Sequence, residues 1–206
     1  MSDIHGNLPA LELVLNDNRS AELFISLGDV VNYGPWSDEC VELLETLSFK
    51  VLLKGNHENN FLAGNYPGKN TLTKTFHDHC IKFFNNYKLI NVYNYEYLIG
   101  DYLLKHTLNN EIVFSDTNIT LTQNTIIGHS HKQYISNKGN YLLINPGSVG
   151  QNRQFINVVS YMLWDTVKND FQIKNTVYDV EHVISKMKEK NYPEICIDYY
   201  ISKNRL

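Results

Sequence analysis

Seven side chains that commonly bind metal ions occur in five short segments of this chain. The segments read SDIHGN, LGDVVNYG, KGNHEN, LKHT and GHSH, in that order. Their two carboxylates, one amide and four imidazoles belong to Asp3, His5, Asp29, Asn56, His106, His129 and His131. Oxygen and nitrogen donors without a thiolate suit divalent cations such as Mn, Fe or Zn. Seven donors suffice for two neighbouring ions, so the sequence predicts a dinuclear metal site.

The spacing inside the segments supports a shared site. Asp3 and His5 are two residues apart, as are His129 and His131. Side chains two apart lie on the same side of an extended segment. The second pair could therefore reach two ions that lie about 3.5–4 Å apart, the separation typical of two-metal hydrolases. A glycine directly before Asp29 allows a sharp turn that presents its carboxylate to both ions.

Most of these segments directly follow a short apolar run. LFISL precedes Gly28-Asp29, VLLK precedes Gly55-Asn56, YLLK precedes His106, and TII precedes Gly128-His129. In layered α/β folds, functional groups gather at the carboxyl ends of strands. We therefore expect residues that are far apart in the sequence to meet at one edge of a sheet.

The first segment is the exception, because only Met1 precedes SDIHGN. The strand-then-ligand pattern predicts a strand that ends at Ser2. Either the start of the chain is truncated or mis-assigned, or the fold lacks a strand that would normally lie in the sheet.

Helical and strand-like patterns alternate in the first half, and strand-like runs dominate the second half. Helices are expected over 8–15, 37–47, 71–87 and 180–190, and strands over 23–27, 51–53, 95–99, 102–105, 125–127, 141–144, 157–164 and 171–178. Asn7 and Ser37 are the expected caps of the first two helices. The last residues are expected to be loosely held. The alternation indicates an α/β fold, and without a linker we expect one domain over residues 1–206.

Composition and charge favour a globular cytoplasmic protein. Of the 206 residues, 43% are apolar and 19% are charged, which is ordinary for a soluble domain. The net charge of -4 weighs against nucleic acid as a partner. No apolar stretch is long enough to span a membrane. The cysteines Cys40, Cys80 and Cys196 form no CxxC pair, which indicates reduced thiols. The sequence leaves a homo-oligomer open.

The motifs D-x-H, GD, GNH[DE], a single His and G-H-x-H, in this order, resemble those of the calcineurin-like metallophosphoesterase superfamily over residues 2–151. In addition, NPGSVGQNR at 145–153 is similar to the NPGSVGQPR signature of a small bacterial and archaeal branch with phosphodiesterase-like members. The resemblance implies a layered αββα sandwich in which two packed mixed sheets are flanked by helices. It also implies a metal-dependent phosphoric ester hydrolase.

The resemblance also implies a role for each ligand. The first metal ion would be held by Asp3, His5, Asp29 and His131, and the second by Asp29, Asn56, His106 and His129. His57 would stay unligated near the leaving-group oxygen and act as general acid. The cofactors would be two divalent ions, with Mn or Fe favoured and Zn, Co or Ni also accepted, which would supply hydroxide at neutral pH.

Two positions depart from the protein phosphatase branch and its diadenosine tetraphosphatase relatives. There an acidic or small residue followed by arginine occurs where this chain has Asn32 and Tyr33. The carboxylate that would orient the catalytic histidine is therefore absent, which weighs against a phosphoprotein phosphatase. Asn7 and Arg153 are the candidates for phosphate contact. The expected partner is a small phosphorylated substrate, nucleotide-type or other, that carries a phosphodiester or phosphomonoester bond.

Simpler interpretations compete at several positions. Taken alone, His106 would be a structural histidine, and NPGS would be a turn. The run His77-Asp78-His79-Cys80 looks like a metal cluster, but residues two apart on a helix point to opposite sides, so we expect a surface position.

Two other functions compete with the hydrolase. One is a scaffold that keeps the fold and has lost the chemistry, and the presence of His57 with all seven ligands weighs against it. The other is a nuclease, which would be expected to carry a basic groove.

Overall fold

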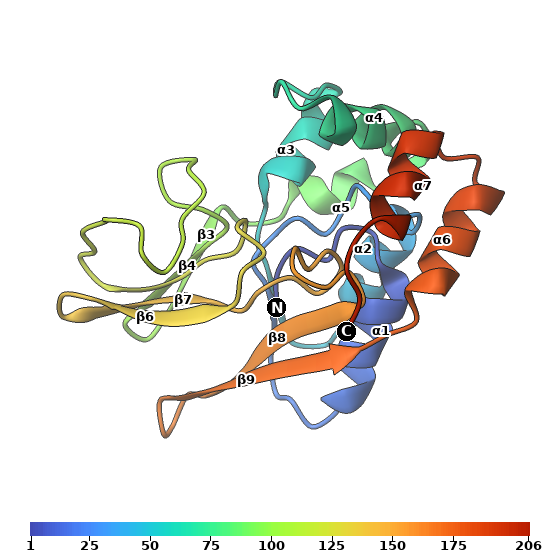
Figure 1. The fold of residues 1–206 in the computed structure, drawn as a ribbon. Coiled ribbons are helices and arrows are strands. Elements are labelled where there is room, and N and C mark those ends of the chain that lie inside the picture. The colour runs from blue at the N-terminus through green and yellow to red at the C-terminus, as the bar shows by residue number, and fades with distance from the viewer.

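Two layers of β-structure stack face to face in the computed structural model, which describes all residues 1–206 (Figure 1). The helices are α1 (Leu8–Asp17), α2 (Ser37–Glu45), α3 (Asn56–Ala63), α4 (Thr71–Cys80), α5 (Tyr87–Asn91), α6 (Val180–Glu189) and α7 (Glu194–Ile201), with a 3₁₀ turn, η1 (Ile81–Phe83), after α4. The strands are β1 (Phe24–Ser26), β2 (Lys50–Leu52), β3 (Glu96–Ile99), β4 (Tyr102–Lys105), β5 (Asn124–Ile126), β6 (Tyr134–Lys138), β7 (Tyr141–Asn145), β8 (Val158–Asp165) and β9 (Asp170–Val177).

The first layer contains two strand pairs that do not bond to each other directly. β1 and β2 are parallel, whereas β8 and β9 form an antiparallel hairpin. Backbone hydrogen bonds join the pairs through two short extended segments: from Leu27 to Met1 (3.0 Å), from Val149 to Ser2 (3.0 Å) and from Ser160 to Ser148 (2.9 Å). Residues 1–3 therefore lie beside β1, in the position that the last residues of a neighbouring strand would occupy.

The second layer is a mixed sheet of five strands in the order β3-β4-β5-β7-β6. Its three central strands are parallel, and the edge strands β3 and β6 are antiparallel to their neighbours. A small apolar cluster between the two layers includes Leu27 from the first layer and Leu104 and Ile144 from the second.

Helices cover only one outer face of this sandwich (Figure 1). The largest apolar cluster holds 30 buried residues and joins the helices to the first layer. The outer face of the second layer is covered by the loop that follows β4, through Val113 and Leu121 packed on Ile127, Tyr134 and Leu143. The expected α/β sandwich is thus confirmed, and a loop takes the place of helices on one side.

Several local expectations differ from the structure. Residues after 190 are not loosely held: they form α7, which buries Cys196 and Tyr200. Ser37 is the first residue of α2 and not its cap, because its hydroxyl accepts a hydrogen bond from the Asn32 N–H at 3.0 Å. The helix expected over 71–87 ends earlier, because α4 and η1 stop at Phe83 and α5 begins only at Tyr87. The strand β6 was not predicted. No helix combines the length and apolarity that crossing a membrane requires.

Candidate metal centre

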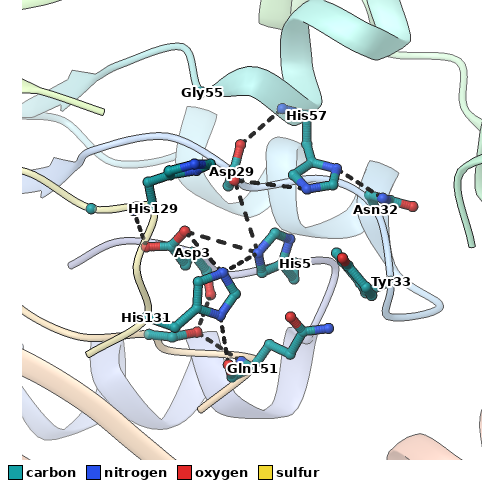
Figure 2. Close-up of polar contacts among 12 residues, drawn as sticks. Asp3, His5, Asp29, Asn32, Tyr33, Gly55, His57, His129, His131 and Gln151 are labelled. Carbon is teal, nitrogen blue, oxygen red and sulfur yellow. Dashed lines mark hydrogen bonds and ion pairs between the residues drawn. The ribbon is translucent and has the colours of Figure 1, made fainter. Parts of the chain in front are cut away.

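The seven expected ligands converge at the carboxyl ends of the central strands. Figure 2 labels Asp3, His5, Asp29, His129 and His131 among them. They come from the segment 1–5, the loop after β1, the start of α3 and the loops after β4 and β5. Three groups bring their donor atoms within 4.8 Å of one another: Asp3, His5 and His131; His5, Asp29 and His57; and Asp29, His106 and His129. Nearly all these side chains are buried.

Two imidazole nitrogens face each other in the first group. Nε2 of His5 lies 3.2 Å from Nε2 of His131. Each ring uses Nδ1 to contact a carbonyl oxygen, Val31 at 3.2 Å and Gln151 at 2.6 Å respectively. A carbonyl can only accept, so each Nδ1 carries the proton and each Nε2 presents a lone pair. Two opposed lone pairs repel unless a cation lies between them.

The carboxylate of Asp3 completes this first group. Its Oδ2 accepts a hydrogen bond from the His129 N–H at 3.1 Å. Its Oδ1 is buried without a hydrogen-bond partner and lies 3.4 Å from Nε2 of His131. A buried carboxylate oxygen without a donor is costly in a protein interior. A cation would satisfy it together with the two imidazoles.

His106 is the centre of the second group. Its Nδ1 donates to the Leu27 carbonyl at 3.0 Å. Its Nε2 faces three acceptor-type atoms, namely Asn56 Oδ1 at 3.1 Å, Asp29 Oδ2 at 3.2 Å and His129 Nδ1 at 3.2 Å. So many lone pairs at one point again require a positive charge, which either a proton or a metal ion can supply.

Asp29 joins the two groups. Its Oδ1 is fixed by the His57 N–H at 2.9 Å, while its Oδ2 lies within 4.0 Å of Nε2 of His5 and 3.2 Å of Nε2 of His106. Gly28 and Gly55 permit this close packing, since a Cβ on Gly28 would lie 2.5 Å from the backbone nitrogen of Gly55. The donors thus form two sites that share one carboxylate, and their chemistry fits two divalent cations.

Burial and neighbouring charges give these groups different protonation states at neutral pH. Burial lowers the pKa of His5 and of His131 well below its usual value, and burial with the charge of His106 lowers the pKa of His129 to about 4. Burial also disfavours the charged form of His106, but the nearby Asp29 carboxylate favours that form more strongly. The pKa of His106 therefore rises to about 9. For Asp3, burial raises the pKa to about 7. At neutral pH the metal-free centre therefore holds a proton on His106.

Metal binding is expected to strengthen with pH, because a metal ion must displace the protons on His106 and Asp3. From pH 9 down to 7, one proton competes, so affinity should fall about tenfold per unit, and more steeply below pH 7 as Asp3 also gains a proton. Titration calorimetry in buffers of different ionisation enthalpy measures both affinity and proton release. An affinity that stays constant from pH 6 to 9 would contradict this assignment.

The backbone at the centre is held in the left-handed region. Positive φ angles occur at seven non-glycine residues here: Asp3, His5, Asp29, Asn32, Tyr33, His129 and His131. Each such residue costs about 1 kcal/mol or more unless the surrounding structure enforces it. Hydrogen bonds around the centre hold these residues in that region, so Asp3, His5, His129 and His131 do not lie on the extended segments that their two-residue spacing predicted.

Sequence reasoning gave no role to Glu58, which the structure makes a central support. Its buried carboxylate accepts hydrogen bonds from four backbone N–H groups: Asp29 (2.8 Å), Val30 (2.7 Å), Val31 (3.2 Å) and Gly55 (2.7 Å). Glu58 thereby fixes the loop that carries Asp29 to the start of α3. The capping-box spacing from Gly55 to Glu58 was the available signal.

Replacing Glu58 with glutamine is expected to lower the free energy of unfolding by about 2–3 kcal/mol, because an amide NH₂ would face backbone donors in place of a charged acceptor. Urea unfolding of the metal-free chain measures this. Glu12, exposed on α1, provides a matched control, and its glutamine variant should stay within about 0.5 kcal/mol of the parent. If both variants lowered the free energy of unfolding equally, the supporting role of Glu58 would be refuted.

The side chain of Asn32 lies beside His57 and orients its ring. Its Nδ2 lies 2.8 Å from Nδ1 of His57, and an amide nitrogen can only donate. Nδ1 of His57 is therefore the acceptor, and the proton of the neutral ring is on Nε2, 3.9 Å from Asp29 Oδ2. Burial lowers the pKa of His57, so the ring is neutral at pH 7. An amide orients this histidine without the carboxylate of the protein phosphatase branch.

The two candidates for phosphate contact differ in position. Asn7 is fully buried: its Oδ1 caps α1 by accepting from Ala10, and its Nδ2 donates to the Gly150 carbonyl and the Tyr178 hydroxyl. All its polar atoms are thus used within the protein. Arg153 is exposed, with one guanidinium nitrogen 3.4 Å from the Tyr199 hydroxyl, and its charge lowers the pKa of His5, His57 and His131. Only Arg153 is free to meet a ligand.

The expected surface position of the second histidine cluster is wrong. His77 and His79 are both buried, since α4 is covered on two sides: His77 packs on Phe61 and His79 on Tyr192. Asp78 between them is exposed and pairs with Lys74 at 2.5 Å. These residues form no metal-binding group with the centre.

Solved structures share this architecture along their whole length. A metallophosphoesterase from Sphaerobacter thermophilus superposes with a TM-score of 0.77, over 98% of this chain and 97% of its own, at 22% identity. A hypothetical protein from Pyrococcus horikoshii gives a TM-score of 0.80, over 97% of this chain and 95% of its own, at 14% identity. These likenesses show that the chain shares their fold.

Sequence comparison gives the family. The calcineurin-like phosphoesterase model matches residues 1–185. An uncharacterised protein of Methanocaldococcus jannaschii is 32% identical over 243 aligned positions, which cover 94% of this chain and 93% of that protein. The chain therefore belongs to the calcineurin-like phosphoesterase family, whose members use divalent metals.

Proposed function

We propose that this chain is a metal-dependent phosphoesterase that hydrolyses a phosphodiester or phosphomonoester bond in a small, nucleotide-type or other, substrate. The observation that carries the proposal is the convergence of imidazole lone pairs and carboxylate oxygens on two positions that share Asp29 Oδ2. Such a cluster of buried donors is costly in a protein without ligands, whereas two bound cations would satisfy it.

The proposed ligands follow the groups in the structure. One ion would be held by Asp3, His5, Asp29 and His131, and the other by Asp29, Asn56, His106 and His129. Mn or Fe is favoured for this oxygen and imidazole set, and Zn, Co or Ni are alternatives. When bound, two such cations acidify a water molecule and offset the charge of the phosphate.

His57 is the proposed general acid. Asn32 holds the ring with its Nε2–H toward the side of Asp29 where the donors converge. In its imidazolium form, His57 would pass the Nε2 proton to the oxygen of the departing alcohol and return to the neutral ring, a contribution of about 10²–10⁴ in rate. Arg153, exposed beside these histidines, is proposed to bind a phosphate oxygen through its guanidinium.

Hydrolysis of two chromogenic esters tests the proposal. Metal-stripped chain receives Mn(II), and turnover of bis-p-nitrophenyl phosphate and p-nitrophenyl phosphate is followed while bound metal is counted. We expect about two ions per chain and turnover that depends on them. The diester-to-monoester ratio then assigns the substrate class. Two bound ions without turnover of either ester would favour the scaffold function, and fewer than two would refute the dinuclear site.

A further inference from the structure

Helix α7 is connected to the metal centre by a series of packed aromatic rings. Between ring centres, Tyr33 lies 4.8 Å from His5 and 5.3 Å from His57. Phe76 of α4 packs on Tyr33 at 4.7 Å and on Tyr199 of α7 at 5.9 Å. Figure 1 shows α7 beside α4. Tyr199 is therefore separated from the histidines of the centre by two rings, those of Tyr33 and Phe76.

The loop after β7 brings Arg153 from the centre to the same tyrosine. The Gln151 carbonyl accepts the hydrogen bond from Nδ1 of His131, and Arg153 follows two residues later. Nη1 of Arg153 donates to the Tyr199 hydroxyl at 3.4 Å, and this is the one hydrogen bond that the guanidinium makes. A guanidinium has five N–H groups, so most of its donors are left for a ligand.

Lys203, just after α7, lies over the ring of the same tyrosine. Its ammonium nitrogen is 4.7 Å from the centre of the Tyr199 ring, within the range of a cation–π contact. Neither Lys203 nor Arg153 is part of an ion pair, although Arg205, two residues after Lys203, pairs with Glu181. Two cations without acidic partners are thus held around one tyrosine, in a protein whose net charge is -4.

The hydroxyl of Tyr199 adds a third donor. It accepts from Arg153 and makes no other hydrogen bond, so its own proton is free. Burial raises the pKa of Tyr199, which keeps the hydroxyl protonated at neutral pH. One guanidinium, one ammonium and one hydroxyl therefore present donors that no group of the protein accepts.

We propose that Arg153, Tyr199 and Lys203 form a subsite for a second phosphate group of the substrate, beside the phosphate that the metal ions would hold. This inference rests on the proposed function, and it narrows the substrate to small molecules with a diphosphate or a longer phosphate chain. Two positive charges and several donors match a group with more than one negative charge and several oxygens. A single carboxylate would leave most of these donors unused.

Tyr199 would also lower the cost of ordering the two cations. Long arginine and lysine side chains lose much rotamer freedom when they bind a ligand. Here one hydrogen bond and one ring contact already restrict Arg153 and Lys203. Preorganised donors bind more tightly because less freedom is lost on binding. Removal of the Tyr199 hydroxyl alone should therefore weaken the subsite.

Binding of two probes to the Mn(II)-loaded chain tests the subsite without any turnover. Inorganic phosphate offers one anionic group, whereas methylenediphosphonate offers two that are joined by a carbon atom and cannot be hydrolysed apart. Lys203→Gln is expected to lower the affinity for methylenediphosphonate about fivefold, and at least about threefold more than the affinity for phosphate, because one charge-assisted contact at a partly exposed site is lost. Titration calorimetry measures both affinities.

A matched control removes the same charge elsewhere. Lys168 is exposed in the turn between β8 and β9, away from α7 (Figure 1). Its glutamine variant should change neither affinity by more than about 1.5-fold, because salt screens charges at that separation.

A second variant separates a binding role of Tyr199 from a structural one. Tyr199→Phe keeps the ring under Lys203 and is expected to lower the affinity for methylenediphosphonate about threefold, with Tm within about 1 °C of the parent. The exposed Tyr97 of β3 provides the control, and its phenylalanine variant should bind both probes as the parent does. A Tyr199 variant that lost Tm but not affinity would show a structural role only.

The outcomes separate the subsite from the proposed function. Equal losses for both probes in Lys203→Gln, or no loss for either, would overturn the subsite even in a chain that hydrolyses esters. Selective loss of methylenediphosphonate binding in a chain that turns over no ester would support the subsite and refute the phosphoesterase.

Discussion

Replacing Asp29 with asparagine is expected to abolish turnover and to weaken metal binding by more than about a hundredfold. Loss of an outer-shell partner typically costs about 10–100-fold in metal affinity, and Asp29 is proposed to bind both ions directly. Its Oδ2 lies within 4.0 Å of Nε2 of His5, His57 and His106. The amide would put either a neutral oxygen or an N–H group at this shared position.

Metal content per chain and titration calorimetry measure the loss. Asp116, exposed in the loop over the second layer, provides the matched control, and its asparagine variant should bind about two ions as the parent does. Circular dichroism should show that both variants keep their secondary structure. If the Asp29 variant still bound two ions with parental affinity, the shared carboxylate and the dinuclear site would both be refuted.

Replacing His57 with alanine is expected to reduce kcat by about 10²–10⁴ for substrates with an alkyl leaving group while about two ions stay bound. The loss should be smaller for p-nitrophenyl esters, because nitrophenolate departs without a proton. The dependence of rate on leaving-group pKa should therefore be steeper in the variant. An Asn32→Ala variant should shift the same dependence in the same direction by a smaller factor, since it frees the ring without removing it.

Single-turnover rates over a series of aryl and alkyl esters provide the test. His182 is the control histidine, exposed on α6 with its ring against Trp36, and its alanine variant should behave as the parent. An unchanged leaving-group dependence in the His57 variant would exclude its role as general acid. A loss of metal in that variant would instead make it a ligand, as its place near Asp29 also permits.

The convergence of Asp29, Asn56, His106 and His129 could be predicted because each follows an apolar strand, and strand ends in an α/β layer meet at one edge. The same local pattern located β1, β4 and β7 within a residue or two. These signals lie in adjacent residues. They need no knowledge of which distant segments pack together.

Other features depend on contacts that a local pattern does not contain. Asn32 orients His57 only because α3 places that ring 2.8 Å away, and Glu58 supports the loop after β1 only because four N–H groups meet there. The last residues form α7 because Tyr200 finds a buried place beside Phe76 of α4. His77 and His79 are buried for the same reason, since helices on both sides cover α4.

Because residues around the metal centre have left-handed backbone conformations, the lifetime of the protein should depend on its supply of metal ions. Without ions, seven strained positions and two opposed imidazoles must be held by the protein's own hydrogen bonds. Bound ions add their binding free energy to the folded state only. In a cell starved of metal, more of the chain should open and reach proteases, so its abundance would report metal status. A pulse-chase half-life that is the same in chelator-treated and Mn-supplied cells would argue against such coupling.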